Sequence, residues 1–546
     1  MAHQWMRVNL ASAQYPFATE LWGRSIIIPG LDENYDRSIA TTATEVDKDK
    51  GIPQAFYMHN VMPTAQGYQA VGFDTAIPAM AGPPDDFDKA FPLQSPTLNK
   101  FLFSPAVGKN YIYNAVVGTW ASISPIAPGV LRNDVLVTTA FLQGETYIYY
   151  ANYGCFKYDA ASGTLVPVVL TGLTPANISG IAAANGYMIA WNNNSVVWSS
   201  ATVVTDFVPS LITGAGGGQL NDAKGAIVVC LPISGGFIAY CEKNAVGAKY
   251  SSNIRFPFIF NEVLGSAGVL SPEQVSWQAN LAEHYCWTTA GFQRIDKSGA
   301  TMLFPELSDF WGNLIFEDFN ETTLLFSVQY LSQPVYTKVT AVADRYVVFS
   351  YGVAADTFTH ALVYDIALKR WGKLKITHRD CFQWNAPNLF GQLTYGQMTM
   401  TYGALATTTY GDLLTQVKTE EVPKKTFAFL QQDGTVKIVN FDLLQTVANG
   451  VLLLGKFQVQ RNKSITHLDS NVENVKNSLN YAMYIIPTYD GKTFQPATAA
   501  QLISASPLSR RYGLRTTGVN LSFLFVGAFN LTSYLFNFTI AGEVRG

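Results

Sequence analysis

A two-strand unit recurs along the chain. Each copy has an apolar strand, a tight polar turn and a second strand that ends in Tyr-Asp or Trp. A lone hairpin cannot bury its apolar face, so hairpins repeated at about 40–50 residues predict the blades of a β-propeller. The copies occupy residues 111–120, 147–159, 186–198, 235–250, 284–296, 345–371 and 426–439. We therefore predict an all-β chain with six or seven blades.

The flanks of the repeats predict two further parts. Residues 1–98 read as an N-terminal arm and cap, with strands at 24–30 and 56–63. The Pro-rich, acidic stretch 80–96 is predicted to be a loop that links the cap to the propeller at 99–449. Residues 450–546 are predicted to form a C-terminal β-domain. Its expected strands are 451–460, 479–491, 519–529 and 534–544. No long helical periodicity appears, so we expect little helix.

The charge distribution separates the C-terminal part from the rest. The net charge is −3 at pH 7, which argues against a basic nucleic-acid-binding domain. Residues 450–546 nevertheless carry nine Lys/Arg against four Asp/Glu. Part of this excess is the cluster Arg510, Arg511 and Arg515, which is either a solvated rim or a docking edge for an acidic partner.

The five cysteines follow no metal-binding or redox pattern. An odd number of scattered cysteines predicts reduced, buried thiols in a protein made in a cytosol. Cys230 and Cys241 could face each other across a hairpin, although spacing alone does not establish a bridge. The chain has no run of 18 or more apolar residues, and we expect no insertion of this chain into a membrane. The most apolar segment, 226–241, is divided into two strands by Pro232 and a Gly pair.

A search for catalytic, cofactor and metal sites gives only weak candidates. The Gly-rich run 214–219 lacks the Lys-Ser/Thr of a phosphate-binding loop and is predicted to be a flexible loop between blades. His284 and Cys286 lie two residues apart, which places them on the same face of a strand. A Cys-His nucleophile pair is conceivable there, but the neighbouring Tyr285 and Trp287 favour a packed strand.

Acidic residues give the remaining candidates. Two loops hold acidic clusters, which are predicted to be solvated because neither matches a calcium-loop pattern. These residues are Asp32, Glu33, Asp36, Asp85, Asp86 and Asp88. Asp206, Asp309 and Asp365 fall near expected strand ends, where a glycosidase would need two paired carboxylates. Since nothing selects a pair, we predict no enzyme, no catalytic residues, no cofactor and no metal.

Three segments resemble a known family. Residues 56–73 resemble the opening of the tail nozzle, tail hub or packaged-DNA stabilisation proteins of short-tailed bacteriophages. The Tyr-Asp…Arg-Trp hairpin at 361–374 is similar to their blades, and 509–546 resembles their closing β-domain. The resemblance implies a structural virion protein that is made in the host bacterial cytoplasm. It also implies that six copies form a ring, a hexamer, below the portal and adaptor.

The resemblance also implies a function and partners. Such a ring retains packaged DNA, contacts tail fibres or a spike, and lets double-stranded DNA pass during ejection without specific binding. A mildly acidic wall suits that passage, because each Lys or Arg contact to phosphate would add salt-dependent binding. Two alternatives stay open: a host-surface propeller that binds or cleaves carbohydrate, and an interaction scaffold outside viruses.

Overall fold

A computed structural model describes most of the repeats and parts of both flanks. The described residues are 5–9, 26–27, 55–81, 86–93, 100–105, 110–123, 137–303, 314–320, 325–330, 337–384, 426–441, 449–458, 463–474, 481–488, 498–503, 512–514 and 520–543, with gaps of five residues or fewer inside the longer ranges. Among them the regular elements are strands, apart from two single-turn 3₁₀ helices, η3 (Pro175–Asn177) and η4 (Pro272–Gln274). The all-β prediction and the expectation of little helix are confirmed for this part of the chain.

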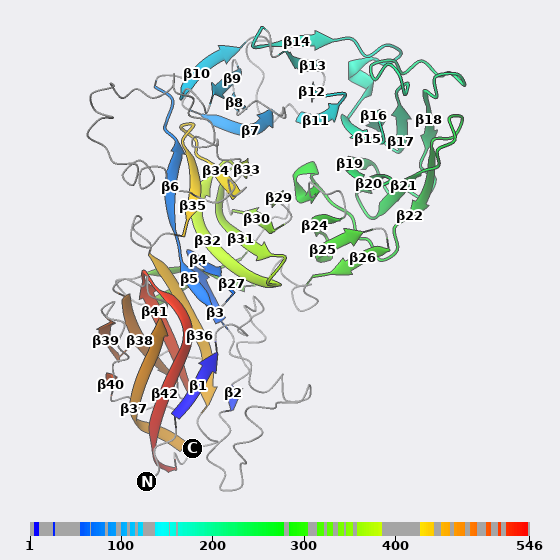
Figure 1. Cartoon of the computed structure of the whole chain (residues 1–546). Coiled ribbons are helices and arrows are strands. Elements are labelled where there is room, and N and C mark those ends of the chain that lie inside the picture. Colours follow the sequence, from blue (N-terminus) through cyan, green and yellow to red (C-terminus); the bar gives the residue numbers. More distant parts are fainter. Residues whose placement is uncertain are drawn as a thin grey trace, which may run out of the picture.

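Seven antiparallel four-stranded units, which we call sheets I to VII, follow one another around a common centre (Figure 1). Six of them are separate sheets, and sheet VI is the first four strands of a ten-stranded sheet. Sheet I contains β7 (Phe87–Leu93), β8 (Lys100–Pro105), β9 (Asn110–Asn114) and β10 (Thr119–Ile123). Sheet II contains β11 (Val137–Leu142), β12 (Glu145–Tyr150), β13 (Gly154–Asp159) and β14 (Thr164–Val168). Sheet III contains β15 (Gly180–Ala184), β16 (Tyr187–Asn192), β17 (Ser195–Trp198) and β18 (Gly216–Gln219).

The remaining four sheets continue the pattern. Sheet IV contains β19 (Ile227–Ile233), β20 (Gly236–Cys241), β21 (Ala245–Tyr250) and β22 (Phe258–Glu262). Sheet V contains β23 (Val275–Trp277), β24 (His284–Thr288), β25 (Gly291–Asp296) and β26 (Gly299–Met302). Sheet VI contains β29 (Thr337–Val342), β30 (Tyr346–Tyr351), β31 (Phe358–Asp365) and β32 (Arg370–His378). Sheet VII contains β33 (Asp380–Trp384), β34 (Thr426–Leu430), β35 (Val436–Asn440) and β6 (Gly72–Ile77).

Each repeat found in the sequence is a hairpin of one of these sheets. Six of the seven repeats supply the second and third strands, and the first repeat supplies the third and fourth strands of sheet I. The innermost strand of each sheet was harder to find. β7 lies inside the stretch 80–96, so the prediction that this stretch is a linking loop is wrong. Its Pro92 is compatible with an innermost strand, because such a strand has one edge without a ladder partner.

Apolar contacts join neighbouring sheets around the whole ring. Sheets I and II share a core around Ile148, and sheets II and III share one around Met188. Sheets III, IV and V are joined by one cluster, and aromatic rings of Phe292 and Phe349, 4.7 Å apart, join sheets V and VI. Further clusters join VI to VII and VII to I. In this way the last sheet packs against the first.

The closing sheet combines both ends of the repeat region. β6 pairs antiparallel with β35, so a strand near residue 75 is the fourth strand of a sheet that otherwise lies beyond residue 380. The predicted boundary at residue 98 falls between β7 and β8, and it separates β6 and β7 from the other strands of sheets VII and I.

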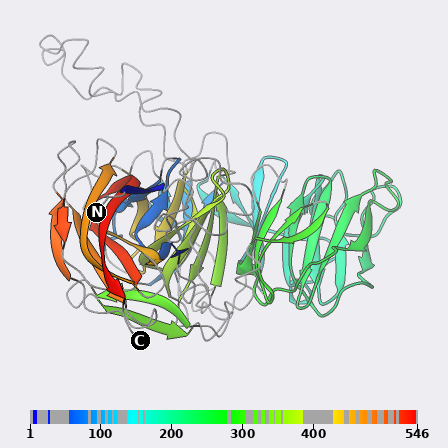
Figure 2. The ribbon, with the colours of Figure 1, turned by 90° about the horizontal axis from the view of Figure 1, so that it is seen from below.

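A second body lies beside the ring and is built from both chain ends (Figures 1 and 2). One of its sheets contains β2 (Ile26–Ile27), β36 (Gly450–Gln458), β41 (Asn520–Gly527), β38 (Tyr481–Thr488) and β39 (Thr498–Ile503), with β3 (Ala55–His59) also paired to β36. The other contains β4 (Val61–Pro63), β5 (Tyr68–Ala70), β42 (Asn530–Glu543), β37 (Lys463–Asn474) and β40 (Tyr512–Leu514), with β1 (Trp5–Asn9) paired to β42. The four strands predicted after residue 450 are confirmed. A separate hairpin is formed by β27 (Leu314–Asn320) and β28 (Leu325–Tyr330).

A continuous sheet joins the second body to the ring. Strand β32 of sheet VI pairs with β4 through Lys373 and Val61, β4 pairs with β5, and β5 pairs with β42. The hydrogen-bonded path therefore runs from the ring into the second body, and no flexible linker intervenes along it.

Candidate functional site

Four charged side chains meet at the centre of the ring, and we call them the charged centre. They are Lys89 of β7, Glu273 of η4, Lys338 of β29 and Asp380 of β33. Each lies at or just before the beginning of an innermost strand. Since every sheet is a meander entered by its innermost strand, these beginnings share one face of the ring, which we call the entry face. The opposite face is the exit face.

Ion pairs hold the charged centre together. Lys89 Nζ lies 2.9 Å from Glu273 Oε1, and Lys338 Nζ pairs with Asp380 Oδ1. Asp380 Oδ2 accepts a hydrogen bond from the backbone N–H of Ala90 at 2.9 Å. Lys89 belongs to sheet I, and Glu273 belongs to the turn η4 that leads into sheet V, which is not a neighbour of sheet I. Their pair therefore bridges the middle of the ring.

The electrostatics of the charged centre keep the Lys338 ammonium charged. Burial alone would lower the pKa of Lys338, but the negative charges of Asp380 and Glu273 outweigh it and hold the pKa above its ordinary value. The Asp380 side chain is only 3% exposed, and its oxygens are occupied by an ammonium group and backbone N–H groups. Loss of the Asp380 carboxylate would therefore leave the buried Lys338 ammonium without a compensating charge.

Side chains on the innermost strands also tie neighbouring sheets to one another. Thr138 Oγ1 accepts from the N–H of Ile181 at 2.8 Å, which joins sheets II and III. Ser276 Oγ accepts from the N–H of Ala341 at 2.8 Å, between sheets V and VI. Thr340 Oγ1 donates to the carbonyl of Cys381 at 2.9 Å, between sheets VI and VII. These bonds satisfy backbone groups on strand edges that have no ladder partner.

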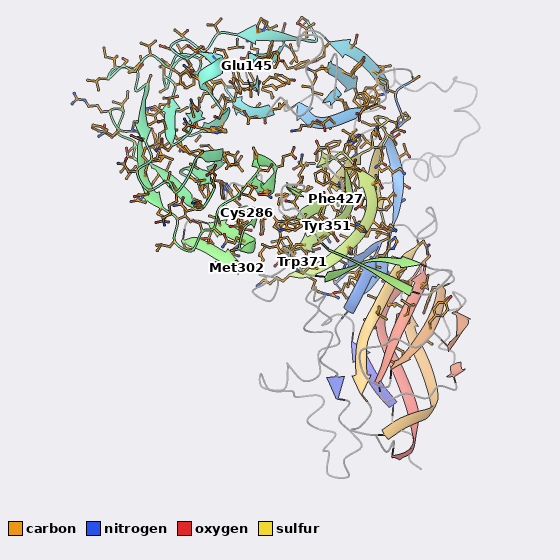
Figure 3. All side chains as sticks on the ribbon, turned by 180° about the vertical axis from the view of Figure 1, so that it is seen from behind. Glu145, Cys286, Met302, Tyr351, Trp371 and Phe427 are labelled. Atoms are coloured by element: carbon orange, nitrogen blue, oxygen red, sulfur yellow. The ribbon has the colours of Figure 1, made fainter. Side chains whose placement is uncertain are left out.

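His284 and Cys286 do lie on one face of β24, but their surroundings are those of a packed core. His284 Nε2 donates to the carbonyl of Pro232 at 2.8 Å, so its Nδ1 accepts from the hydroxyl of Tyr240 at 2.9 Å. Burial lowers the pKa of His284 to about 4 and raises the pKa of the Cys286 thiol to about 12. Both groups are therefore neutral near pH 7, and a neutral thiol is a poor nucleophile. Figure 3 places Cys286 on sheet V, beside the sheet that carries Tyr351 and Trp371.

All five cysteines are buried and unbridged, as predicted. Cys230 and Cys241 lie on the adjacent strands β19 and β20 but are not directly opposite each other. Pro232 and the Gly pair do divide segment 226–241 into these two strands.

A polar cluster that the sequence did not reveal lies on the exit face of sheet V. Tyr285 donates its hydroxyl hydrogen to Glu283 Oε1, while Arg294 lies 3.6 Å from Glu283 and 3.5 Å from Asp296. Burial and the Glu283 carboxylate raise the pKa of Tyr285. Tyr285 is 1% exposed, so a substrate cannot reach its hydroxyl. The signal in the sequence was the pair Arg294 and Asp296, two residues apart and therefore on one face of a strand.

The predicted acidic residues do not form one site. Asp206 Oδ1 accepts from the N–H of Val208, and Asp365 Oδ1 accepts from the N–H of Leu368, each at 3.0 Å. Both carboxylates therefore organise local turns, in different parts of the ring. Asp86 pairs with Arg379 at 3.0 Å, and Asp88 is buried. In the described ranges no group of three or more His, Cys, Asp or Glu residues could hold a metal ion.

Several predicted residues lie outside the described residues. They are the docking candidates Arg510, Arg511 and Arg515 and the acidic residues Asp32, Glu33, Asp36, Asp85 and Asp309.

The Gly-rich run is a strand, so the prediction of a flexible loop is wrong. Gly216–Gln219 forms β18 and pairs with β17 at the outer edge of sheet III. A Cβ added to Gly217 would lie 2.8 Å from Val197 Cγ1, and one added to Gly218 would lie 3.3 Å from the Phe260 ring. Glycine is needed here because neighbouring side chains already fill the space, and no phosphate cradle results.

Comparison with known proteins adds no assignment, since no family model and no curated protein matches this chain. Among the described residues, no helix is long and apolar enough to cross a membrane.

Proposed function

We propose that the seven sheets are the blades of a closed seven-bladed β-propeller. Three observations support this: cores between all neighbouring sheets, the pairing of β6 with β35, and the charged centre that bridges the middle of the ring. The pairing of β6 with β35 gives sheet VII its fourth strand from the other end of the repeat region, and such radial repetition leaves only short, protected sheet edges.

We further propose that this chain is a structural protein of a phage tail, a nozzle or hub component below the portal and adaptor. The observation that carries the proposal is the continuous sheet from sheet VI through β4 and β5 to β42. It makes the ring and the second body one stiff unit. A component that retains packaged DNA under pressure needs such stiffness, and the segments that resemble tail proteins, 56–73, 361–374 and 509–546, include the strands at this joint.

The joint itself is closely packed. The guanidinium of Arg370 lies 4.2 Å from the centre of the Tyr68 ring, and its Nη1 donates to the carbonyl of Thr64 at 2.9 Å. The N–H of Lys375 donates to Asn60 Oδ1 at 2.9 Å. Each contact connects β32 of the ring with the segment that leads into the second body, and together they resist bending at the joint.

In the proposed assembly about six copies surround the tail axis, as in the family that the chain resembles. The second body faces the axis and the adaptor, and the propeller projects outward. DNA then passes along the axis of the assembly. In this role the side chains bind and position other subunits, and none of them makes or breaks bonds.

Quantitative mass spectrometry of purified particles tests the proposal. The chain should be present at a fixed ratio to the portal and should remain with tails released from the capsid. A chain that is absent from particles, or that turns over a polysaccharide in a hydrolase assay, would refute the structural role.

A further inference from the structure

Two neighbouring loops on the exit face of sheets III and IV expose apolar side chains. One loop connects β17 to β18 and the other connects β21 to β22; we call residues 210–215 and 251–257 the tip loops. Their exposed fractions are large: Ile212 87%, Phe256 70%, Leu211 69% and Ile254 46%. Apolar side chains gathered in this way usually mark a surface that another body covers.

The tip loops are held rigidly although they protrude. Within the first loop the N–H of Ser210 donates to Ala215 and the N–H of Gly214 donates to Ser210, both at 3.0 Å. In the second loop the N–H of Ser251 donates to Pro257 at 2.9 Å and the N–H of Phe256 donates to Asn253 at 3.0 Å. Side chains on such loops lose little conformational entropy when they are covered.

The two loops form one surface. A Cβ added to Gly214 would lie only 3.0 Å from Cγ1 of Ile254, so the loops are in contact. Beneath them Trp198 Nε1 donates to the carbonyl of Gly214 at 2.9 Å, and the Trp198 and Phe258 rings lie 5.6 Å apart. The apolar tips therefore stand on a packed aromatic base shared by sheets III and IV.

The charges nearest the tip loops are mainly positive. Residues 207–221 contain no charged side chain, and residues 245–261 contain only Lys249 and Arg255, both exposed. The one carboxylate in the connection between β17 and β18 is Asp206, whose Oδ1 accepts from the N–H of Val208. Arg255 lies between Ile254 and Phe256 in the sequence. Apolar tips with adjacent cations match a lipid surface that carries phosphate groups, because the side chains enter the apolar boundary while the cations pair with headgroups.

We propose that the tip loops dock this protein on an anionic lipid bilayer. A standard protein interface uses about 20–30 residues per partner, far more than the four apolar side chains of the tip loops. Reversible contact with a membrane needs only a small buried apolar area together with attraction to anionic lipids. The site lies on sheets III and IV, away from the second body (Figure 1). If several copies project outward, as in the proposed function, weak contacts add up through avidity. The prediction of no membrane insertion rests on the absence of long apolar runs. Exposed loops contact a bilayer surface without such a run.

Sedimentation of the full chain with phosphatidylcholine vesicles, with and without phosphatidylglycerol, tests the proposal. We expect binding that requires phosphatidylglycerol and weakens with salt. The double variant Ile212→Ser, Phe256→Ser should reduce the binding about tenfold or more, and Arg255→Gln should reduce it severalfold. Leu264→Ser is the matched control, because Leu264 is 78% exposed but follows β22 at the opposite end of that strand.

Three results would overturn the proposal: no vesicle binding by the unmodified chain, an equal loss in the Leu264→Ser control, or self-association in solution that the double variant abolishes. The last result would identify the tip loops as a contact between copies. Vesicle binding and particle stoichiometry are measured separately, so failure of the docking proposal is distinguishable from failure of the tail-component proposal.

Discussion

Lys89 Nζ and Glu273 Oε1 lie 2.9 Å apart although their sheets are separated by two others along the shorter arc of the ring. Between them stand Lys338 and Asp380 from these two intervening sheets. The four charges therefore link sheets I, V, VI and VII at the entry face. These contacts connect the four sheets to one another, and they engage the four charged groups in ion pairs.

Replacing Asp380 by Ala should destabilise the fold strongly. The change leaves the Lys338 ammonium without its carboxylate and the N–H of Ala90 without its acceptor, so the free energy of unfolding should fall by about 3–5 kcal/mol. Urea denaturation followed by tryptophan fluorescence measures this. Glu262→Gln is the control, because its partner Lys224 is 61% exposed and the urea midpoint should stay unchanged. Equal midpoints for both variants would show that the charged centre does not stabilise the ring.

Acid should destabilise the protein through two buried histidines. Burial lowers the pKa of His284 from 6.5 to about 4 and that of His378 to about 3, so the unfolded chain binds protons first as the pH falls. Their contribution is complete above pH 6.5 and is lost as the pH falls toward 4 and then 3. The loss for His284 is on the order of 3 kcal/mol.

Urea midpoints measured at steps between pH 7 and pH 4 test this dependence. The variant His284→Gln, which keeps a donor and an acceptor but cannot become charged in this range, should show a shallower dependence. An unchanged slope would contradict the assignment of a neutral, buried His284.

Gly372→Ala should weaken the joint between the ring and the second body. A Cβ at this position would lie 2.6 Å from the carbonyl oxygen of Val61 and 2.9 Å from Met62 Sδ, so β32 and β4 would have to separate. We expect a loss of about 1–3 kcal/mol and faster proteolytic cleavage near residue 64. Gly247→Ala is the control, since its nearest atom would be 3.5 Å away. Cleavage at the same rate in both variants would argue that the joint does not depend on this pairing.

A disulfide between β6 and β35 should lock the ring. Thr75 and Lys437 are register partners, and directly opposite residues have Cβ atoms close enough for a bridge after small shifts. The double variant Thr75→Cys, Lys437→Cys should become oxidised and migrate faster on a non-reducing gel. The single variant Thr75→Cys is the control, because the native cysteines are buried. If the double variant does not oxidise, β6 is not the closing strand.

The sequence predicted the parts of the fold that depend on neighbouring residues. Each hairpin repeat was visible because its two strands and its turn are contiguous, as in Tyr187–Asn192 and Ser195–Trp198, where two apolar runs flank a polar turn. The predicted all-β class and the strands after residue 450 follow from the same local pattern. The strand pairing of β6 with β35 has no such signal, because the two segments are more than 350 residues apart.

The charged centre could not be predicted for the same reason. Lys89, Glu273, Lys338 and Asp380 have unremarkable sequence neighbours and meet only once the innermost strands share a face. The Gly-rich run was misread because its role depends on Val197 and Phe260, which fill the space that a side chain would need. For His284 and Cys286 the shared face was correct, and burial decided against a reactive pair.

Cryo-electron microscopy of the intact particle tests the central claim most directly. The account predicts several copies of this chain in a symmetric ring below the portal, with the second body toward the axis and the propeller outward. A reconstruction without this chain in the tail, or with isolated copies attached elsewhere, would contradict it.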